Sequence, residues 1–228
     1  MKPDVIKISG LFKDYNADDL AVHALNGIDL VVKRGEFTAI AGPSGSGKTT
    51  LLNIIGGIDR PCRGEVEVAG MNLNIMNAKE LSDLRLRKIG FIFQAYNLIP
   101  VLTALENVEY ILLLQGVGKR ERRERAESVL RDVGLEKEMK RRPAEISGGQ
   151  QQRVAVARAI VSEPELILAD EPTANLDQAT GSALLDLMKR LNAGRGTTFL
   201  FSTHDRMVMK RAGRLINLRD GRIVQGAK

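Results

Sequence analysis

The sequence has little of what marks a secreted or membrane-embedded protein. Cys62 is its only cysteine, so no disulfide can form within the chain, which fits a reducing compartment. The best candidate for a membrane segment is the uncharged run 89–105, but Gln94, Asn97 and Pro100 interrupt it and it is short for a bilayer. The first residues also lack the apolar stretch of a signal peptide. We therefore expect a protein without a membrane-spanning segment.

Tryptophan is absent and aromatic residues make up only 4% of the chain, so aromatic surfaces give no guide to function. The remaining composition, 43% hydrophobic and 27% charged over 228 residues, fits one domain with a real core. A net charge of +6 suits any polyanion, whether nucleotide, nucleic acid or anionic membrane. Composition alone does not choose among these partners.

Short β-branched runs recur with helical stretches between them, which predicts an α/β fold. The runs at 166–169 and 197–201 are apolar throughout, as strands buried on both faces of a parallel sheet must be. Earlier runs alternate and adjoin turn residues, which indicates an antiparallel side layer. The expected strands are 5–9, 28–32, 36–41, 65–69, 89–93, 166–169, 197–201, 215–218 and 223–225.

The section from 103 to 160 has little strand signal and helical spacing, with a charged helix that Gly134 should end. We therefore predict one domain over 1–228. Its α/β core and β side layer would occupy 1–94 and 161–228, and a helical subdomain would be inserted at 95–160.

One loop has the pattern G-x-x-x-x-G-K-[ST] between a predicted strand and a helical segment, the context that confirms a phosphate-binding loop. Its glycines let backbone N–H groups converge on phosphate oxygens, and the helix N-terminus adds positive charge. Lys48 should reach the β- and γ-phosphates, and the Thr49 hydroxyl should coordinate Mg²⁺. An ordinary glycine-rich turn is the alternative, which the context disfavours. The predicted nucleotide-binding residues here are Gly42, Pro43, Ser44, Gly45, Ser46, Gly47, Lys48, Thr49 and Thr50.

Two carboxylates follow the apolar run 166–169, at the end of a strand where ligands bind in open α/β sheets. Asp170 is suited to hold magnesium, directly or through water. Glu171 could orient or deprotonate an attacking water. The alternative is a pair of solvated carboxylates that starts a loop, because Pro172 follows.

A second glycine-rich segment, Ser147, Gly148, Gly149 and Gln150, precedes a predicted helix and could bind phosphate at the helix start. Taken in isolation, it reads as an N-cap with a glycine turn. A single bound triphosphate already has its loop at 42–49, however. A second such helix start makes sense if it serves the nucleotide of a neighbouring copy, which predicts a homodimer.

The segment 147–150, with the loop 42–49 upstream and the pair 170–171 downstream, closely resembles the ATP-binding-cassette (ABC) ATPase family. The resemblance covers essentially the whole chain. It implies a P-loop NTPase (RecA-like) core with an antiparallel β side layer and an inserted helical subdomain. It also implies ATP and Mg²⁺ as ligands, a homodimer that closes with ATP sandwiched between its two subunits, and ATP hydrolysis in a cycle of dimer closure and reopening.

The same resemblance assigns four further residues. It implies that Gln94 links the γ-phosphate and the metal to the helical subdomain, and that His204 senses the γ-phosphate. Asp177, in the run 175–177, would lie where the chain crosses the dimer interface, and Tyr15 would stack on adenine. Plainer interpretations stay open: a polar strand end for Gln94, a structural histidine, and a packed edge aromatic for Tyr15.

Three stretches, 91–98, 147–153 and 168–177, look closest to the ABC group that drives lipoprotein release and macrolide export. The resemblance implies an integral-membrane permease that contacts the region after Gln94, with this chain peripheral at the cytoplasmic face of the inner membrane. The apolar run 95–102 would form a groove for a permease helix if exposed, or would pack inside the helical subdomain. A related pair acts in cell division, and the sequence does not separate these roles.

Two other functions are weighed against transport. Nucleic-acid-associated relatives carry long coiled coils, zinc modules or two cassettes, which do not fit 228 residues with one cysteine, so no specific nucleic acid is expected. A non-hydrolysing sensor is disfavoured because Glu171 and His204 are both present. The basic clusters at 119–123 and 140–142 indicate a solvated helix face or, alternatively, contact with anionic lipid headgroups.

Overall fold

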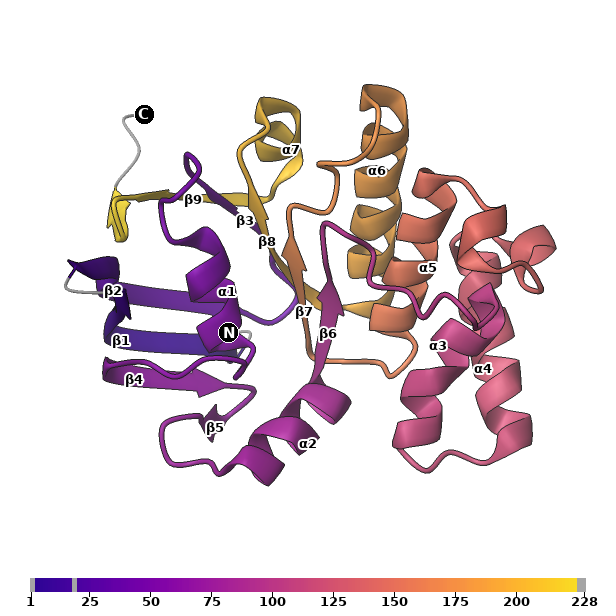
Figure 1. Ribbon diagram of the computed structural model, residues 1–228, viewed down its shortest axis with the longest axis horizontal. Helices are drawn as coiled ribbons and strands as arrows, with labels where there is room; N and C mark the ends of the chain where they lie inside the picture. Colours follow the sequence, from indigo (N-terminus) through magenta and orange to yellow (C-terminus); the bar gives the residue numbers. More distant parts are fainter. Residues whose placement is uncertain (1–2, 18–19, 225–228) are drawn as a thin grey trace.

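Two β-sheets with helices packed around them make up the computed structural model, which describes residues 3–17 and 20–224 (Figure 1). The larger sheet has the order β10-β9-β3-β8-β7-β6, and all its neighbouring strands are parallel except β9 and β10. Its strands are β3 (Phe37–Ala41), β6 (Ile89–Ile92), β7 (Leu166–Asp170), β8 (Thr198–Thr203), β9 (Arg214–Arg219) and β10 (Arg222–Val224). Gln225, predicted as the end of the last strand, lies outside the described residues.

The central strands are buried on both faces, as their apolar sequence predicts. Alternate residues of β7 and β8 point to opposite sides of the sheet. Ile167 and Phe201 belong to the hydrophobic cluster on one side, and Leu168 and Leu200 to the cluster on the other. The sheet therefore separates two cores.

Helices cover each side of this sheet (Figure 1). Helix α1 contributes to the core that contains Leu168, whereas α5 and α6 contribute to the core that contains Ile167. The helices are α1 (Lys48–Ile55), α2 (Ala78–Lys88), α3 (Ala104–Leu114), α4 (Lys119–Asp132), α5 (Gly148–Ile160), α6 (Gln178–Arg195) and α7 (Arg206–Arg211), with short 3-10 turns at Glu136–Glu138 and Pro143–Glu145. None of the helices in residues 3–17 and 20–224 combines the length and apolar character needed to span a bilayer.

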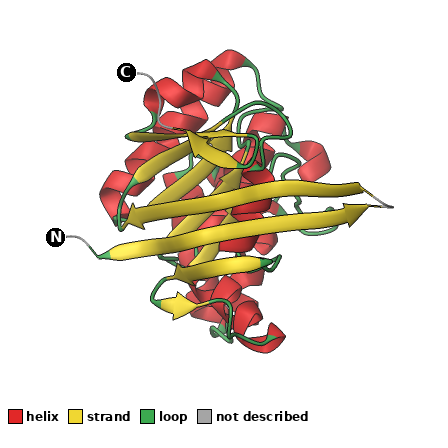
Figure 2. Cartoon of the chain, turned by 90° about the vertical axis from the view of Figure 1, so that its left-hand side faces the viewer, coloured by secondary structure: helices red, strands yellow, loops and turns green. Residues whose placement is uncertain are grey.

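The second sheet is the antiparallel side layer, with the order β2-β1-β4-β5. It consists of β1 (Asp4–Ala17), β2 (Leu20–Lys33), β4 (Arg63–Val68) and β5 (Met71–Asn72). Figure 2 shows β1 and β2 as a long pair across one side of the molecule. The sequence predicts only their halves 5–9 and 28–32, because Gly10 and the register shift between Ile8 and Leu11 interrupt the alternation.

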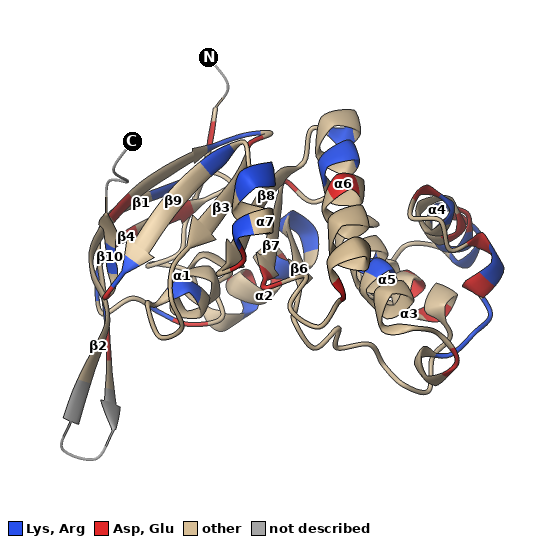
Figure 3. Cartoon of the chain, turned by 90° about the horizontal axis from the view of Figure 1, so that it is seen from above, with Lys and Arg blue, Asp and Glu red and all other residues tan. Residues whose placement is uncertain are grey.

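Helices α3, α4 and α5 pack together beside the sheet. Gly134 terminates helix α4 as predicted: the helix ends at Asp132, and Gly134, two residues further on, has a φ of 74°. The N–H of Gly134 donates to the Arg131 carbonyl, and the N–H of Leu135 donates to the Leu130 carbonyl. Its basic residues alternate with acidic ones (Figure 3), and the side chain of Arg120 pairs with that of Glu124 at 2.9 Å. Arg123–Glu127 and Arg125–Glu121 pair in the same way, which favours the solvated face over a lipid contact.

Candidate active site

The phosphate loop runs from the end of β3 to the first residue of α1. Two of its glycines lie where a side chain would not fit. A Cβ on Gly42 would come within 2.2 Å of the Leu218 carbonyl oxygen, and one on Gly47, whose φ is 99°, within 2.5 Å of the Ala24 oxygen. These close contacts with the strands β9 and β2 fix the shape of the loop.

Lys48 is the first residue of α1, and its side chain is only 6% exposed. Its ammonium folds back over the loop and donates to the carbonyls of Gly42 and Pro43, each at 2.9 Å. The first turn of α1 holds no acidic residue. The buried hydroxyl of Ser46 has no partner among the described residues. This concave, donor-rich and positively charged loop fits a triphosphate.

Asp170 ends β7 at the carboxyl edge of the sheet, beside the phosphate loop. Its Oδ2 accepts a hydrogen bond from the Thr49 hydroxyl at 2.9 Å, and its Oδ1 accepts one from the Ser202 hydroxyl at 2.5 Å. The Ser202 oxygen in turn accepts the N–H of Glu171 at 2.9 Å. The sequence analysis missed Ser202. Its only signal was a polar residue after an apolar strand, and the pairing of β7 with β8 brings it to Asp170.

The pair of Thr49 and Asp170 fits a magnesium ion that arrives with a nucleotide. Mg²⁺ prefers hard oxygen ligands and usually takes one or two carboxylates together with substrate phosphates. Within residues 3–17 and 20–224, no group of three or more His, Cys, Asp or Glu side chains could hold a metal by itself. The chemistry of the donors therefore favours a metal shared with the substrate over a resident one.

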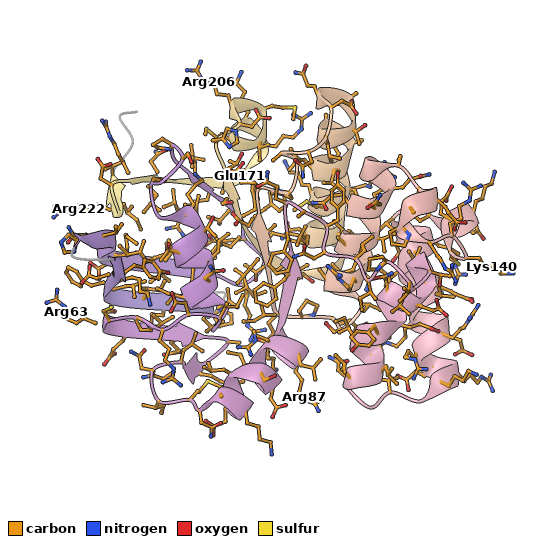
Figure 4. The ribbon with its side chains drawn as sticks, viewed as in Figure 1. Arg63, Arg87, Lys140, Glu171, Arg206 and Arg222 are labelled. Atoms are coloured by element: carbon orange, nitrogen blue, oxygen red, sulfur yellow. The ribbon has the colours of Figure 1, made fainter. Side chains whose placement is uncertain are left out.

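Glu171 lies at the end of the sheet (Figure 4), between Lys48 and His204. Its Oε2 is 2.6 Å from Nδ1 of His204, and its Oε1 is 3.9 Å from the Lys48 ammonium. The φ of Glu171 is 46°, a left-handed conformation that is strained for a residue with a side chain. The structure thus holds this carboxylate at the mouth of the phosphate loop, and His204, after β8, lies where the sequence predicts.

Tyr15 lies on β1, near the edge of the side layer, and is 39% exposed. Its hydroxyl donates to Oδ2 of Asp59 at 2.6 Å. Burial raises the pKa of Tyr15, and the bond to Asp59 raises it further, while Thr50 beside it acts in the opposite direction. Tyr15 is therefore a neutral, partly exposed ring next to the first turn of α1.

The segment 147–150 lies on the other side of the sheet from α1 (Figure 1). Ser147 caps α5 in a reciprocal pair of bonds with Gln150, at 2.9 and 3.3 Å. A Cβ on Gly149 would come within 2.5 Å of the Thr180 methyl, so α5 starts against α6. Among the described residues this segment makes no hydrogen bond to the phosphate loop. Within one chain, the capping interpretation holds.

Asp177 also caps a helix: its side chain accepts the N–H groups of Ala179 and Thr180 at the start of α6, at 3.1 and 3.0 Å. The bonds from Thr180 lower the pKa of this carboxyl. The carbonyl of Gln94 accepts a bond from the Asn175 amide at 2.9 Å, and the Gln94 side chain is exposed, without a hydrogen-bond partner in the described part of the chain. In the described part of the chain neither side chain makes a hydrogen bond to the phosphate loop.

The loop after Gln94 is attached to the far end of α5. Tyr96 and Asn97 have φ angles of 56° and 49°, and the half-buried guanidinium of Arg158 donates to the carbonyls of both, at 2.9 Å to Tyr96. Burial lowers the pKa of Arg158. One helix therefore starts at Ser147 and ends beside this loop.

The comparisons with known proteins agree with this geometry. The family model described as "ABC transporter" matches residues 25–174. The lipoprotein-releasing system ATP-binding protein LolD of Anaeromyxobacter dehalogenans is 46% identical over 220 residues, covering 96% of this chain and 92% of that protein. The macrolide export ATP-binding/permease protein MacB of Hyphomonas neptunium is 45% identical over 224 residues, covering 98% of this chain and 35% of that protein.

A solved structure shows the same fold. The ATP-binding cassette MJ0796 of Methanocaldococcus jannaschii, a dimer in a post-hydrolysis state bound to ADP and Pi, superposes with a TM-score of 0.90 at 44% identity, covering 98% of each chain. The predicted fold class, a P-loop core with an antiparallel side layer and helical elements, is confirmed. The chain belongs to the ABC transporter family and is one of its ATP-binding, ATP-hydrolysing cassettes.

Proposed function

We propose that this cassette powers a separate membrane permease of the lipoprotein-release or macrolide-export type. The observation that carries the proposal is the convergence of Lys48, Thr49, Asp170, Glu171 and His204 at one end of the sheet. The names of the relatives LolD and MacB support the permease type. A permease-like partner in cell division is the alternative within the same mechanism.

In this proposal each residue has a distinct task. The loop 42–49 and Thr50 hold the triphosphate, with Lys48 exchanging its bonds to loop carbonyls for phosphate oxygens. Thr49, Asp170 and Gln94 hold Mg²⁺, which would offset phosphate charge. Glu171 takes the proton from the attacking water.

His204 holds the Glu171 carboxylate and meets the γ-phosphate. The 2.6 Å contact between Nδ1 of His204 and Oε2 of Glu171 supports this pairing of roles.

The second proposal is a head-to-tail homodimer with two shared sites. At the start of α5 the N–H groups of Ser147 and Gln150 are used in the capping pair, whereas those of Gly148 and Gly149 have no partner within the described residues. No side chain of segment 147–150 bonds the loop 42–49 of the same chain in that part of the structure. Such a helix start would complete the nucleotide site of a partner copy, with Asp177 near the crossing point. The dimeric relative MJ0796 supports this arrangement.

Mixing two inactive variants tests the shared site. Lys48→Ala disables the phosphate loop and Ser147→Arg blocks the helix start, so each variant alone should lack ATPase activity. A mixed dimer carries one site with both defects and one intact site. Because half the dimers of an equal mixture are mixed and half their sites are intact, we expect about a quarter of wild-type phosphate release. No recovery in mixtures whose exchange of subunits is verified would contradict a shared site.

A groove supports the permease contact. A cavity of about 520 Å³ lies between α2, β6, α3 and the loop after Gln94, and its lining includes Phe91, Ile99, Tyr110 and Arg158. Of the run 95–102, Leu98 packs against the core, Ile99 lines the groove and Val101 is exposed. One part of the run thus packs inside the protein and another part is available to a partner. The groove could receive a permease helix. In this proposal the chain is peripheral at the cytoplasmic face of the inner membrane.

Purification from native membranes tests the partner. The wild-type chain should retain an integral-membrane protein, whereas Tyr110→Arg in the groove should lose it and keep basal ATPase activity. Ile75→Arg is the matched control, because Ile75 is an exposed apolar residue outside the groove lining. If Tyr110→Arg retains the membrane protein, the groove is not the contact site for the permease. Binding of DNA or ribosomes at physiological salt would favour the nucleic-acid alternative.

A further inference from the structure

A partly buried ion pair lies directly behind Tyr15. Lys13 precedes Tyr15 by two residues on β1, and the pairing with β2 shifts register between Lys13 and Asp14. Both side chains nevertheless reach the same residue, Asp59. Lys13 is only 9% exposed, and its ammonium donates to Oδ1 of Asp59 at 2.7 Å and to the Arg60 carbonyl at 2.9 Å. A lysine is rarely buried without a partner, and here the partner comes from the loop that follows α1.

Asp59 joins this ion pair to the aromatic ring. One carboxylate oxygen accepts from Lys13 and the other accepts the Tyr15 hydroxyl at 2.6 Å. Burial alone would raise the pKa of Asp59, but the bonds from Lys13 and Tyr15 outweigh burial and hold it below its usual value. Burial likewise lowers the pKa of Lys13, and Asp59 more than restores it. Both groups therefore stay charged, and the hydroxyl of Tyr15 is fixed by an ionised acceptor.

One face of the Tyr15 ring is also occupied. The Lys13 ammonium lies 4.7 Å from the ring centroid, within the range of a cation–π contact. The backbone, the hydroxyl and one face of the ring are thus all held, while 39% of the residue is exposed. Val22, which pairs with Tyr15 across the hairpin and is 54% exposed, extends the apolar surface. A ring held this way has lost its freedom before any ligand arrives.

We propose that Asp59, anchored by Lys13, is a positioning residue for base recognition. It fixes the Tyr15 ring so that the open face of the ring meets the purine base of the nucleotide whose phosphates lie on the loop 42–49. The inference rests on the proposed role of Tyr15 in ATP binding. Its consequence is that Asp59 affects the binding of the base and leaves the binding of the phosphates unchanged.

The test compares a ligand with a base and a ligand without one. Calorimetric Kd values for Mg·ATP and Mg·tripolyphosphate are measured for wild type, Tyr15→Ala, Asp59→Ala and the double variant. Loss of stacking should raise the Kd for ATP roughly 10- to 100-fold in Tyr15→Ala. Asp59→Ala should raise it about 3- to 10-fold, and the double variant should match Tyr15→Ala, because Asp59 acts through Tyr15. The Kd for tripolyphosphate should stay within about twofold throughout.

Asp14→Ala is the matched control. Asp14 adjoins Tyr15 on the same strand, but its carboxylate pairs with His23 at 2.7 Å and makes no bond to the Lys13–Asp59 pair. This variant should bind ATP as the wild type does. If Asp59→Ala does not fold, Asp59→Asn replaces it. The amide can still accept the Tyr15 hydroxyl but no longer neutralises Lys13, and ATP binding should weaken while tripolyphosphate binding persists.

Other results of these titrations would contradict either the role inferred for Asp59 or the role of Tyr15 on which it rests. Unchanged ATP affinity in Asp59→Ala, with a clear loss in Tyr15→Ala, overturns the inference and leaves the proposed role of Tyr15 intact. Unchanged ATP affinity in Tyr15→Ala overturns that role itself. Equal losses for ATP and tripolyphosphate in Asp59→Ala, or additive losses in the double variant, would show that Asp59 only stabilises the fold.

Discussion

Replacing Glu171 with glutamine should stop ATP turnover while ATP still binds. The change keeps the size of the side chain and a polar group facing His204, but it removes the negative charge and, with it, the ability to accept a proton. Loss of a positioned general base lowers kcat by about 100- to 10,000-fold. Because the negative charge 3.9 Å from Lys48 also disappears, the affinity for ATP should not fall. Phosphate release at saturating Mg·ATP measures the first effect, and calorimetry measures the second.

The same variant should accumulate as an ATP-bound dimer, because closure would no longer be followed by hydrolysis. Light scattering of the eluted protein with and without ATP detects this species. Glu67→Gln, an exposed glutamate on β4 in the side layer, is the control and should leave turnover unchanged. Unchanged hydrolysis by Glu171→Gln would remove Glu171 from the mechanism, and normal affinity without dimers would argue against closure driven by ATP.

Replacing Lys48 with alanine should weaken ATP binding itself by about 100-fold or more. The Lys48 ammonium lies over the loop 42–49 and is the cationic side chain that the loop offers to the phosphates. Each charge-assisted hydrogen bond contributes about 1.5 to 3 kcal/mol, so losing two of them corresponds to roughly a 100-fold or larger rise in Kd. Titration calorimetry with Mg·ATP measures this rise.

Lys189→Ala is the matched control, because Lys189 is an exposed lysine on α6. Its Kd for ATP should equal that of the wild type. Circular dichroism checks that Lys48→Ala is folded, since the carbonyls of Gly42 and Pro43 lose their donor. A folded Lys48→Ala protein that binds ATP within about twofold of wild type would contradict the assignment of the loop.

The two variants separate two parts of one site. Glu171→Gln should keep affinity and lose turnover, whereas Lys48→Ala should lose both.

The sequence predicts the parts of this site that are local in the chain. The loop 42–49 is one continuous motif whose glycines are required by nearby backbone, and the pair 170–171 directly follows the strand that positions it. Ser202 could not be found in this way, because its role depends on the pairing of two strands 32 residues apart in sequence. The bond between Lys13 and Asp59 spans 46 residues, and nothing in either local sequence indicates it.

The same difference between local and long-range features applies to the prediction of the fold. The central strands were predicted because burial on both faces leaves a continuous apolar run. The long hairpin of β1 and β2 was underestimated because its twist and register shifts break the alternation that marks a strand. The proposed role of segment 147–150 depends on a second copy, so its signal lies in the order of motifs along the chain and not in contacts within one chain.

Helix α5 has a mechanical consequence. It contains 13 residues, about 20 Å at 1.5 Å per residue, with Ser147 capping one end and Arg158 gripping the loop after Gln94 near the other. Its interior has no proline or glycine beyond the first turn, so it has no built-in hinge. If a shared nucleotide tilts the first turn of α5, the whole helix would tilt with it. Its far end would then move at the groove proposed for the permease. The cassette would then need no series of small rearrangements, because the single helix α5 connects the start of the shared nucleotide site to the groove proposed for the permease.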